Sequence, residues 1–139
     1  MSAIRKTGLV CHELYMWHDT GNYAGPMPFG SPVQPDTHAE NPETKRRFRN
    51  LLEVSGMNDH LTLLKPRSAS EEEILRFHTP EHLANVQKIS AETGGDAGFF
   101  TPAGRGSYEI ALLSAGGVLS ALEAVVAGAI DNAYALVRP

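Results

Sequence analysis

Three short apolar runs, separated by stretches with helical spacing, constrain the fold of this chain more than any other feature. They are residues 7–11 (TGLVC), 61–64 (LTLL) and 133–137 (AYALV). Runs of this length predict buried strands, because helices need about ten residues or more. The last run is unbroken, which is typical of a parallel strand covered on both faces. The pattern predicts an α/β fold with an open parallel sheet, whose functional groups gather beyond the carboxyl ends of the strands.

Four segments between these runs carry the signals of helices. They are residues 43–54, residues 71–77, the stretch from Pro80 to the Gly94-Gly95 pair, and residues 107–127. Ser68 and Glu71 match a capping box that would open the second helix, and Thr79 would cap the third. Gly116 and Gly117 interrupt the fourth, at about 1 kcal/mol each relative to alanine. Such glycines indicate that another backbone segment passes close by.

A proline-rich segment over residues 19–42 interrupts the regular structure. It holds five of the nine prolines, so neither a helix nor a central strand continues through it. A connection of this length in a compact domain is usually functional or an interaction arm. Tyr23, Met27, Phe29 and Val33 make it too apolar for a solvated linker. We therefore expect a contact surface here, with a disordered insertion as the alternative.

The composition restricts the class of protein and of partner. The chain has 139 residues, 42% hydrophobic and 20% charged, as one globular domain would. Its formal net charge of -4 argues against nonspecific binding to nucleic acid or anionic lipid. No stretch is expected to reach the roughly 20 apolar residues of a membrane span, and the start does not read as a signal peptide. We expect a cytoplasmic protein, or a part of one, with neither nucleic acid nor membrane as a partner.

Chemically reactive side chains give few signals on their own. The six histidines lack metal-ligand spacing, so surface or capping roles account for them best. Cys11 lies in an apolar run and is expected to be an inert thiol. Arg47 belongs to the only basic cluster and lies beside Leu51 on its helix. If Arg47 turns inward it must hold an acid or an anion, and the equally good alternative is a solvated helix face.

Seven segments occur in an order that is specific to one family. They are residues 13–21 (ELYMWHDTG), 41–52 (NPETKRRFRNLL), 75–83 (LRFHTPEHL), 94–96 (GGD), 106–111 (GSYEIA), 113–117 (LSAGG) and 131–139 (DNAYALVRP). Together they resemble the start of class II histone-deacetylase-like amidohydrolases, especially the bacterial ones. The resemblance implies the arginase/deacetylase fold, with residues 1–139 as the N-terminal part of a single deacetylase domain. It also implies a zinc hydrolase that removes acetyl groups from lysine side chains, polyamines or related amides.

The same resemblance implies that the catalytic centre lies beyond this chain. In family members the strand similar to AYALVRP leads into a Pro-Gly-His-His motif, whose histidines act as acid and base. The zinc ligands and a carbonyl-polarising tyrosine lie further along. We therefore expect no catalytic or zinc-binding residue within residues 1–139, and an inactive chain when it is taken alone. The rival interpretations are a noncatalytic oligomerisation or regulatory fragment and a small-molecule binding module that uses the basic helix.

Six residues are implied as lining the substrate or product pocket. They are Arg47, Trp17, His18, Asp19, Phe99 and Phe100. Arg47 matches a family arginine that lines the cavity under the metal, although Asn41 stands where the family usually has histidine. Residues 15–42 resemble a first rim loop that in bacterial relatives joins subunit contacts, which implies a homo-oligomer formed through residues 19–42. Residues 96–101 resemble a second rim loop, where one of the two phenylalanines replaces an acid that binds the substrate backbone.

Overall fold

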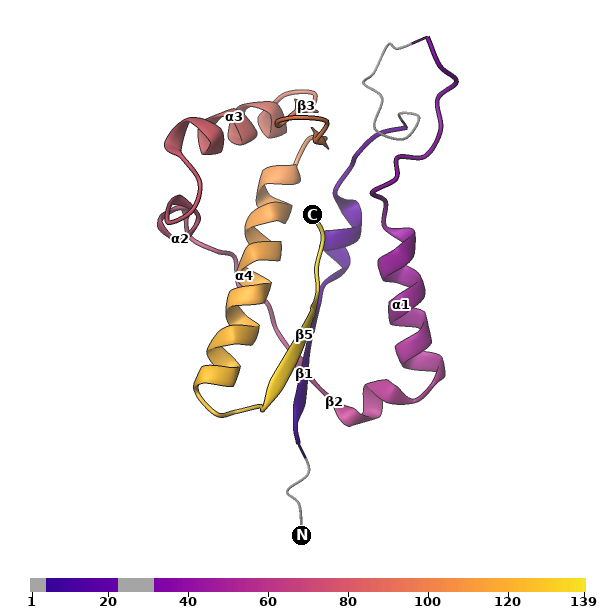
Figure 1. Cartoon of the computed structure of the whole chain (residues 1–139), viewed down its shortest axis with the longest axis vertical. Helices are drawn as coiled ribbons and strands as arrows, with labels where there is room; N and C mark the ends of the chain where they lie inside the picture. Colours follow the sequence, from indigo (N-terminus) through magenta and orange to yellow (C-terminus); the bar gives the residue numbers. More distant parts are fainter. Residues whose placement is uncertain (1–4, 23–31) are drawn as a thin grey trace.

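A computed structural model describes residues 5–22 and 32–139. In chain order the elements are β1 (Thr7–Cys11), η1 (Glu13–Trp17), α1 (Glu43–Val54), η2 (Met57–His60), β2 (Leu61–Leu64), α2 (Glu71–Leu75), α3 (Pro80–Ala91), β3 (Gly95–Asp96), β4 (Pro102–Ala103), α4 (Ser107–Val126) and β5 (Asn132–Leu136), where η marks a 3-10 helix. Figure 1 shows the strands lying between α4 and α1. The prediction of an α/β fold with a parallel sheet is confirmed.

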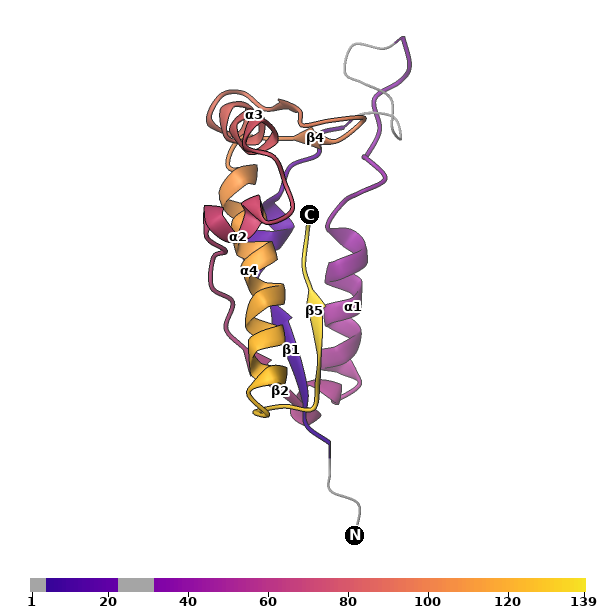
Figure 2. The same ribbon diagram turned by 60° about the vertical axis from the view of Figure 1, so that its left-hand side comes forward.

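The sheet has the order β2-β1-β5, with both neighbours parallel to β1. Parallel neighbours need long crossover connections, and the segments holding α1 and α4 supply them. Leu9 and Val10 of the central strand are buried, and Val10 joins Tyr15, Met16 and Ala121 in the apolar core. Figure 2 shows α4 and α1 on opposite sides of the strands. The core therefore lies mainly between β1, η1 and α4.

Strand β5 differs from the prediction that both of its faces are covered. It begins one residue earlier, at Asn132, and Tyr134 at its middle is exposed while Leu136 is buried. From the side of α1, the ring of Phe48 reaches the ring of Tyr134 at 5.3 Å. Among the described residues, the first part of β5 does not have both faces covered, because residues 132–134 are exposed although α4 contacts the strand and Phe48 contacts Tyr134.

Helices α1 and α3 confirm the local signals, and α2 corrects one of them. Helix α1 has the predicted bounds, and Thr79 caps α3 by accepting a hydrogen bond from the backbone N–H of His82. The capping box of α2 is formed by Ser70 and Glu73, not by Ser68 and Glu71 as predicted. The reason is tertiary: residues 67–69 run along α4, where the N–H of Ala69 donates to the carbonyl of Leu112.

Helix α4 confirms the close approach that its two glycines indicated. A Cβ at Gly116 would collide with the backbone of residues 67–69, and one at Gly117 would collide with the Tyr15 hydroxyl. The helix ends at Val126, one residue before the predicted bound. By length and composition its 20 residues could cross a membrane, which corrects the expectation that no stretch would qualify. Its contacts in the structure are with β1, η1, α3 and β5.

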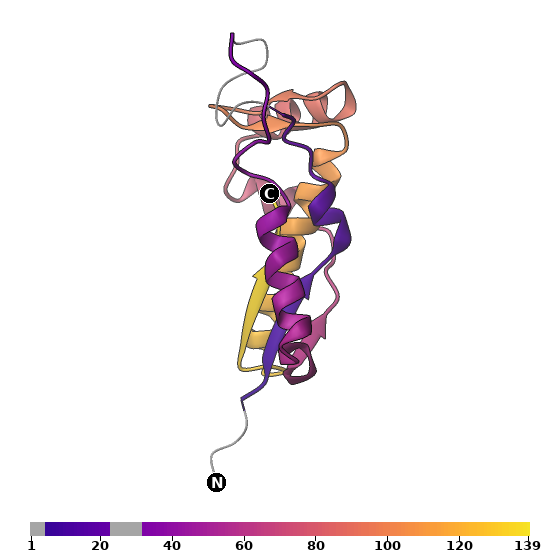
Figure 3. The same ribbon diagram turned by 90° about the vertical axis from the view of Figure 1, so that its right-hand side faces the viewer.

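The segment after α3, where a rim loop is expected over residues 96–101, contains regular structure. Strands β3 and β4 form a short antiparallel hairpin that pairs Gly95 with Ala103 and Asp96 with Pro102. The carboxylate of Asp96 accepts hydrogen bonds from the backbone N–H groups of Gly98 and Thr101, which closes the tip. Figure 3 shows this hairpin at the same end of the molecule as the C-terminus.

Candidate functional site at the carboxyl edge of the sheet

The carboxyl ends of β1 and β5 lie side by side, because Cys11 pairs in register with Leu136. The chain leaves β1 into η1 and leaves β5 into Arg138, so both exits meet at one edge of the sheet (Figure 1). Open α/β proteins place their ligands beyond this edge. We refer to residues 12–20, residues 38–40 and Arg138 as the edge cluster.

Arg138 lies at the centre of the edge cluster, with 1% of its surface exposed. Its Nε donates to Glu40 Oε1 at 2.8 Å, and its Nη1 donates to the carbonyl oxygens of His18 at 2.6 Å and Tyr15 at 3.3 Å. A buried guanidinium is costly unless it is paired and hydrogen bonded, and these contacts satisfy most of it. One side chain therefore joins the end of β5 to two other segments.

Glu40, the carboxylate partner of Arg138, also contacts three other residues. Its carbonyl accepts a hydrogen bond from Thr20 Oγ1 at 2.7 Å, its N–H donates to His38 Nδ1, and Lys45 Nζ lies 3.6 Å from its carboxylate. Within the described part of the chain, Glu40 Oε2 and Arg138 Nη2 are buried without a hydrogen-bond partner. The contact between the two side chains is thus made through one oxygen of the carboxylate.

His18 is buried at the same edge, where its Nδ1 lies 2.9 Å from Ser107 Oγ at the start of α4. Burial lowers the pKa of the His18 imidazole, and the neighbouring Arg138 cation lowers it further. The ring is therefore neutral at pH 7. A neutral imidazole beside a buried guanidinium avoids two cations at one point.

This pKa gives a pH prediction for stability. In the unfolded chain the His18 imidazole has a pKa near 6.5, and it binds protons more readily there than in the folded chain. The contribution of His18 to the free energy of unfolding is therefore full above about pH 6.5. It is lost as the pH falls, because protonation then favours the unfolded chain. We expect His18→Asn to lose less stability between pH 7 and pH 5 than the wild type in urea denaturation. The exposed His60→Asn is the control and should keep the wild-type loss. An equal loss in the wild type and His18→Asn would contradict the assignment.

Asp19 connects the edge cluster to the β3–β4 hairpin. Its carbonyl accepts a hydrogen bond from the N–H of Gly104 at 2.8 Å, and a Cβ at Gly104 would come within 2.7 Å of the Asp19 side chain. At the hairpin tip Phe99 is 90% exposed and stacks edge-on against Phe100 at 4.5 Å. The structure thus brings His18 and Asp19 to one edge and attaches the two phenylalanines to it through the hairpin. Trp17 is exposed on the last turn of η1.

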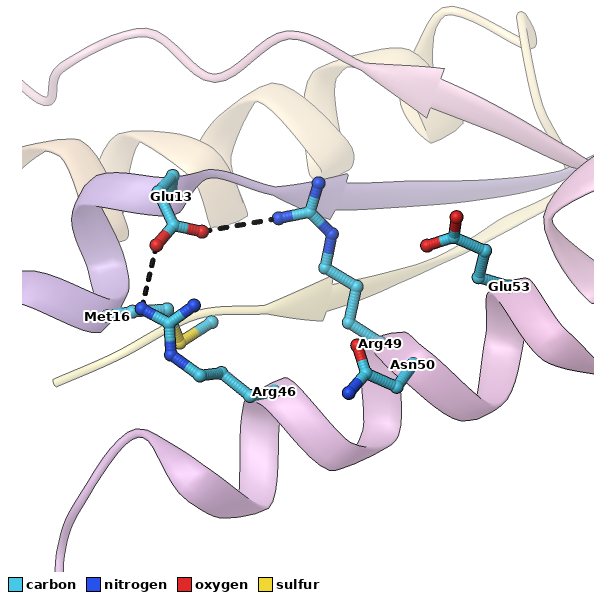
Figure 4. A pocket seen from close by; sticks show the side chains of 6 residues that line it. All are labelled: Glu13, Met16, Arg46, Arg49, Asn50 and Glu53. Atoms are coloured by element: carbon cyan, nitrogen blue, oxygen red, sulfur yellow. Dashed lines mark hydrogen bonds and ion pairs between the residues drawn. The ribbon is translucent and has the colours of Figure 1, made fainter.

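Arg47 faces away from the other described residues. Its side chain is 81% exposed and lies 3.8 Å from Glu43 of its own helix. The inward positions of α1 are taken by Arg46 and Arg49, which contact Glu13 at 2.7 Å and 3.5 Å (Figure 4). Because they are three residues apart, Arg46 and Arg49 lie on the same side of the helix, and both face Glu13, which follows β1.

A cavity of about 230 Å³ lies between η1 and this face of α1. It is lined by Glu13, Met16, Arg46, Arg49, Asn50 and Glu53 (Figure 4). The hydrogen bond from Arg46 lowers the pKa of the Glu13 carboxyl, so this carboxylate stays charged between the two arginines. Two arginines and two glutamates give the lining no excess positive charge. The charges of this lining therefore do not favour the interpretation of α1 as a module that binds a small anionic molecule.

The histidines and acids of the chain do not form a metal site where the structure describes them. Across residues 5–22 and 32–139, no group of three or more histidine, cysteine, aspartate or glutamate side chains could hold a metal ion. His12 caps η1 by accepting from the N–H of Leu14, and His78 stacks with His82 on the surface at 5.1 Å. These residues therefore do not fit a zinc site.

Sequence reasoning missed Arg138, Glu40 and Ser107. A signal for Arg138 was present, because an arginine directly after a buried strand must find partners or pay a large desolvation cost. Glu40 lies 98 residues away in the sequence, and no spacing rule connects the two. Ser107 reads as an ordinary first residue of a helix.

Comparison with known proteins gives one consistent family. A model of the histone deacetylase domain matches residues 38–139. A histone deacetylase-like amidohydrolase of Pseudomonas aeruginosa is 47% identical, over 97% of this chain and 36% of its own length. A probable deacetylase of Archaeoglobus fulgidus is 32% identical over 96% of this chain and 33% of its length, and the human polyamine deacetylase HDAC10 is 33% identical over 76% and 17%.

The solved structures agree with the sequence matches. The crystal structure of the HDA15 HD domain superposes with a TM-score of 0.80 at 25% identity, over 96% of this chain and 35% of that one. The chain thus spans about a third or less of the length of these relatives.

Proposed function

The chain belongs to the histone deacetylase family, and on that premise we propose that it is the N-terminal part of a zinc-dependent amidohydrolase that deacetylates lysine side chains, polyamines or related amides. The observation that carries the proposal is the 47% identity to a histone deacetylase-like amidohydrolase along 97% of the chain. The names of other relatives, a polyamine deacetylase and a probable deacetylase, support acetylated amides as the substrate class.

This chain and the rest of the protein would supply different parts of the active site. Zinc ligands and the general base would come from residues outside these 139, since the described residues do not fit a metal site. This chain would supply a wall of the pocket at the carboxyl edge of the sheet. Its contribution would be to bind and orient the substrate.

We propose that the pocket mouth is lined by Trp17, His18, Asp19, Phe99 and Phe100. Exposed aromatic rings give an aliphatic amine chain an apolar surface, and the Asp19 carboxylate favours a cationic group at its far end. We propose that Arg47 completes this set in the cavity under the metal, where the rest of the protein would cover its side chain, which is exposed beside Glu43 among the described residues.

We further propose that the protein is cytoplasmic and forms a homo-oligomer through residues 19–42. Val33 in this segment is exposed, which supports a contact surface. Tyr23, Met27 and Phe29, on which the expectation also rests, lie outside the described residues. The noncatalytic oligomerisation fragment remains the competing interpretation.

The test is acetate release by the full-length protein encoded by the gene. It is incubated with an acetyl-lysine peptide and, separately, with N-acetylated polyamines. We expect acetate from one substrate class or both, loss of activity after metal chelation and recovery with Zn²⁺. The absence of acetate from every substrate with zinc-loaded protein would overturn the proposal and favour the noncatalytic interpretation.

A further inference from the structure

We propose that Arg138 is a positioning residue, which fixes the pocket mouth by holding two separate rim segments against the end of β5. The inference rests on the proposed function, because it names a residue that sets the geometry of that same site. Its evidence is independent of the family match and consists of the contacts that Arg138 makes.

The contacts of Arg138 cross most of the chain. Its carbonyl acceptors, Tyr15 and His18, lie 123 and 120 residues away, and its carboxylate partner Glu40 lies 98 residues away. The first two belong to the segment that follows β1, and the third to the segment that precedes α1. The planar guanidinium presents donors in a fixed fork, so it sets the relative positions of both segments.

The chemistry of the contact favours a geometric role over a purely stabilising one. The Arg138 side chain is buried and the Glu40 side chain is 38% exposed, so removing the guanidinium from water has a desolvation cost that an apolar side chain of similar volume avoids. Ion pairs with a buried member are therefore weak evidence for stability. The cost is increased here by Arg138 Nη2 and Glu40 Oε2, which are buried and lack partners in the described ranges. An apolar residue could fill this space, but it could not hold two backbone carbonyls and a carboxylate in register.

Arg138 is connected to the residues proposed for the pocket mouth through a series of hydrogen bonds. The carbonyl of His18 accepts from Arg138, and the His18 ring contacts Ser107 Oγ. The next carbonyl, that of Asp19, accepts from Gly104 at the base of the hairpin. A shift of the His18 carbonyl therefore moves Asp19 and the support of the hairpin that carries Phe99.

A parallel link joins the two rim segments to each other. The hydroxyl of Thr20 donates to the carbonyl of Glu40 at 2.7 Å, so the first segment contacts the second directly as well as through Arg138. Loss of the guanidinium fork is expected to loosen both segments together. It should leave the helices distant from this edge unchanged.

The experiment uses the full-length protein with three variants and a control. Arg138→Lys keeps the charge and removes the fork, Arg138→Met removes both, and Glu40→Gln keeps an acceptor for Nε without the ion pair. Arg76→Met is the control, because Arg76 is exposed at the end of α2 and, among the described residues, forms an ion pair with Glu72 alone. The readouts are kcat and KM for an acetyl-lysine peptide and amide hydrogen exchange along the chain.

We expect Arg138→Lys to lower kcat/KM by about 100-fold, mainly through KM, because misplacement of binding groups weakens substrate orientation. Exchange should accelerate in residues 15–20 and 38–40 and stay at the wild-type rate in the last turns of α4, at the opposite end of that helix from the hairpin (Figure 1). Glu40→Gln should show the same pattern to a smaller extent, and it decides the question if neither Arg138 variant folds. Arg76→Met should match the wild type in both readouts.

Two results would overturn the inference. One is wild-type kcat/KM in Arg138→Lys, or in Glu40→Gln where the Arg138 variants do not fold. The other is an equal acceleration of exchange along the whole chain, which is the signature of a general stabilising role. A wild-type protein without acetate release would instead contradict the proposed function, and the exchange pattern would still decide whether Arg138 positions the two segments.

Discussion

Replacement of Tyr15 by alanine is expected to lower the free energy of unfolding of the full-length protein by about 4 kcal/mol. The Tyr15 side chain has no exposed surface and packs with Val10, Met16 and Ala121 in the apolar core. Its removal leaves a cavity beneath η1. The variant therefore loses the transfer free energy of the buried ring and also bears the energetic cost of the cavity. Urea denaturation monitored by circular dichroism measures the difference.

Tyr15→Phe is the matched control, because it keeps the ring and removes the hydroxyl. This hydroxyl donates to the carbonyl of Leu113 at 3.2 Å, and its loss is expected to cost about 1 kcal/mol. Burial raises the pKa of Tyr15 to about 12, so the hydroxyl stays protonated throughout the measurement. Equal losses for the alanine and phenylalanine variants would show that the hydrogen bond, and not the packing of the ring, holds η1 in place.

Gly116→Val is expected to destabilise the protein by about 3 kcal/mol. A Cβ at this position would collide with the carbonyl oxygen of Arg67 and the N–H of Ala69, and backbone atoms cannot move aside as a flexible side chain can. The segment would have to shift and would strain the hydrogen bond from Ala69 to Leu112. The effect outweighs the gain in helix propensity on replacing glycine by valine, which is only about 0.3 to 0.5 kcal/mol.

Leu122→Val serves as the control for Gly116→Val, since it places the same β-branched side chain at an exposed position of α4. A change within about 0.5 kcal/mol is expected there. Denaturation of the two variants under identical conditions separates helix propensity from the close approach. A loss below 1 kcal/mol for Gly116→Val would contradict the packing described for α4.

Local signals predicted the fold well where one short stretch decides the outcome. The Thr79 cap, the bounds of α1 and β2, and the close approach at Gly116 depend on neighbours within a few residues or on the absence of a side chain. The capping box of α2 shows that such local signals cannot always identify the residue that caps a helix. Ser68 and Ser70 are each followed three residues later by a glutamate, and the contact of residues 67–69 with α4 selects Ser70.

The candidate site was predicted in part, because its members come from distant segments. The family resemblance implied His18 and Asp19 as pocket residues, and in the structure they follow η1 at the carboxyl end of β1. Spacing along a helix could not tell which arginines of α1 face a distant partner. Arg46 faces Glu13, which lies 33 residues before it. The Arg138 contacts span about 100 residues or more and needed the folded chain to be seen.

We propose that the carboxyl edge of the sheet forms the substrate pocket of an acetyl-amide hydrolase. Hydrogen exchange of the full-length protein, with and without a peptide carrying a non-hydrolysable ketone analogue of acetyl-lysine, tests it most directly. We predict slower exchange on binding in residues 15–20, 38–40 and 95–103, which lie at or are attached to that edge. Protection confined to the opposite edge of the sheet, around residues 57–61 and 127–132, would contradict the account.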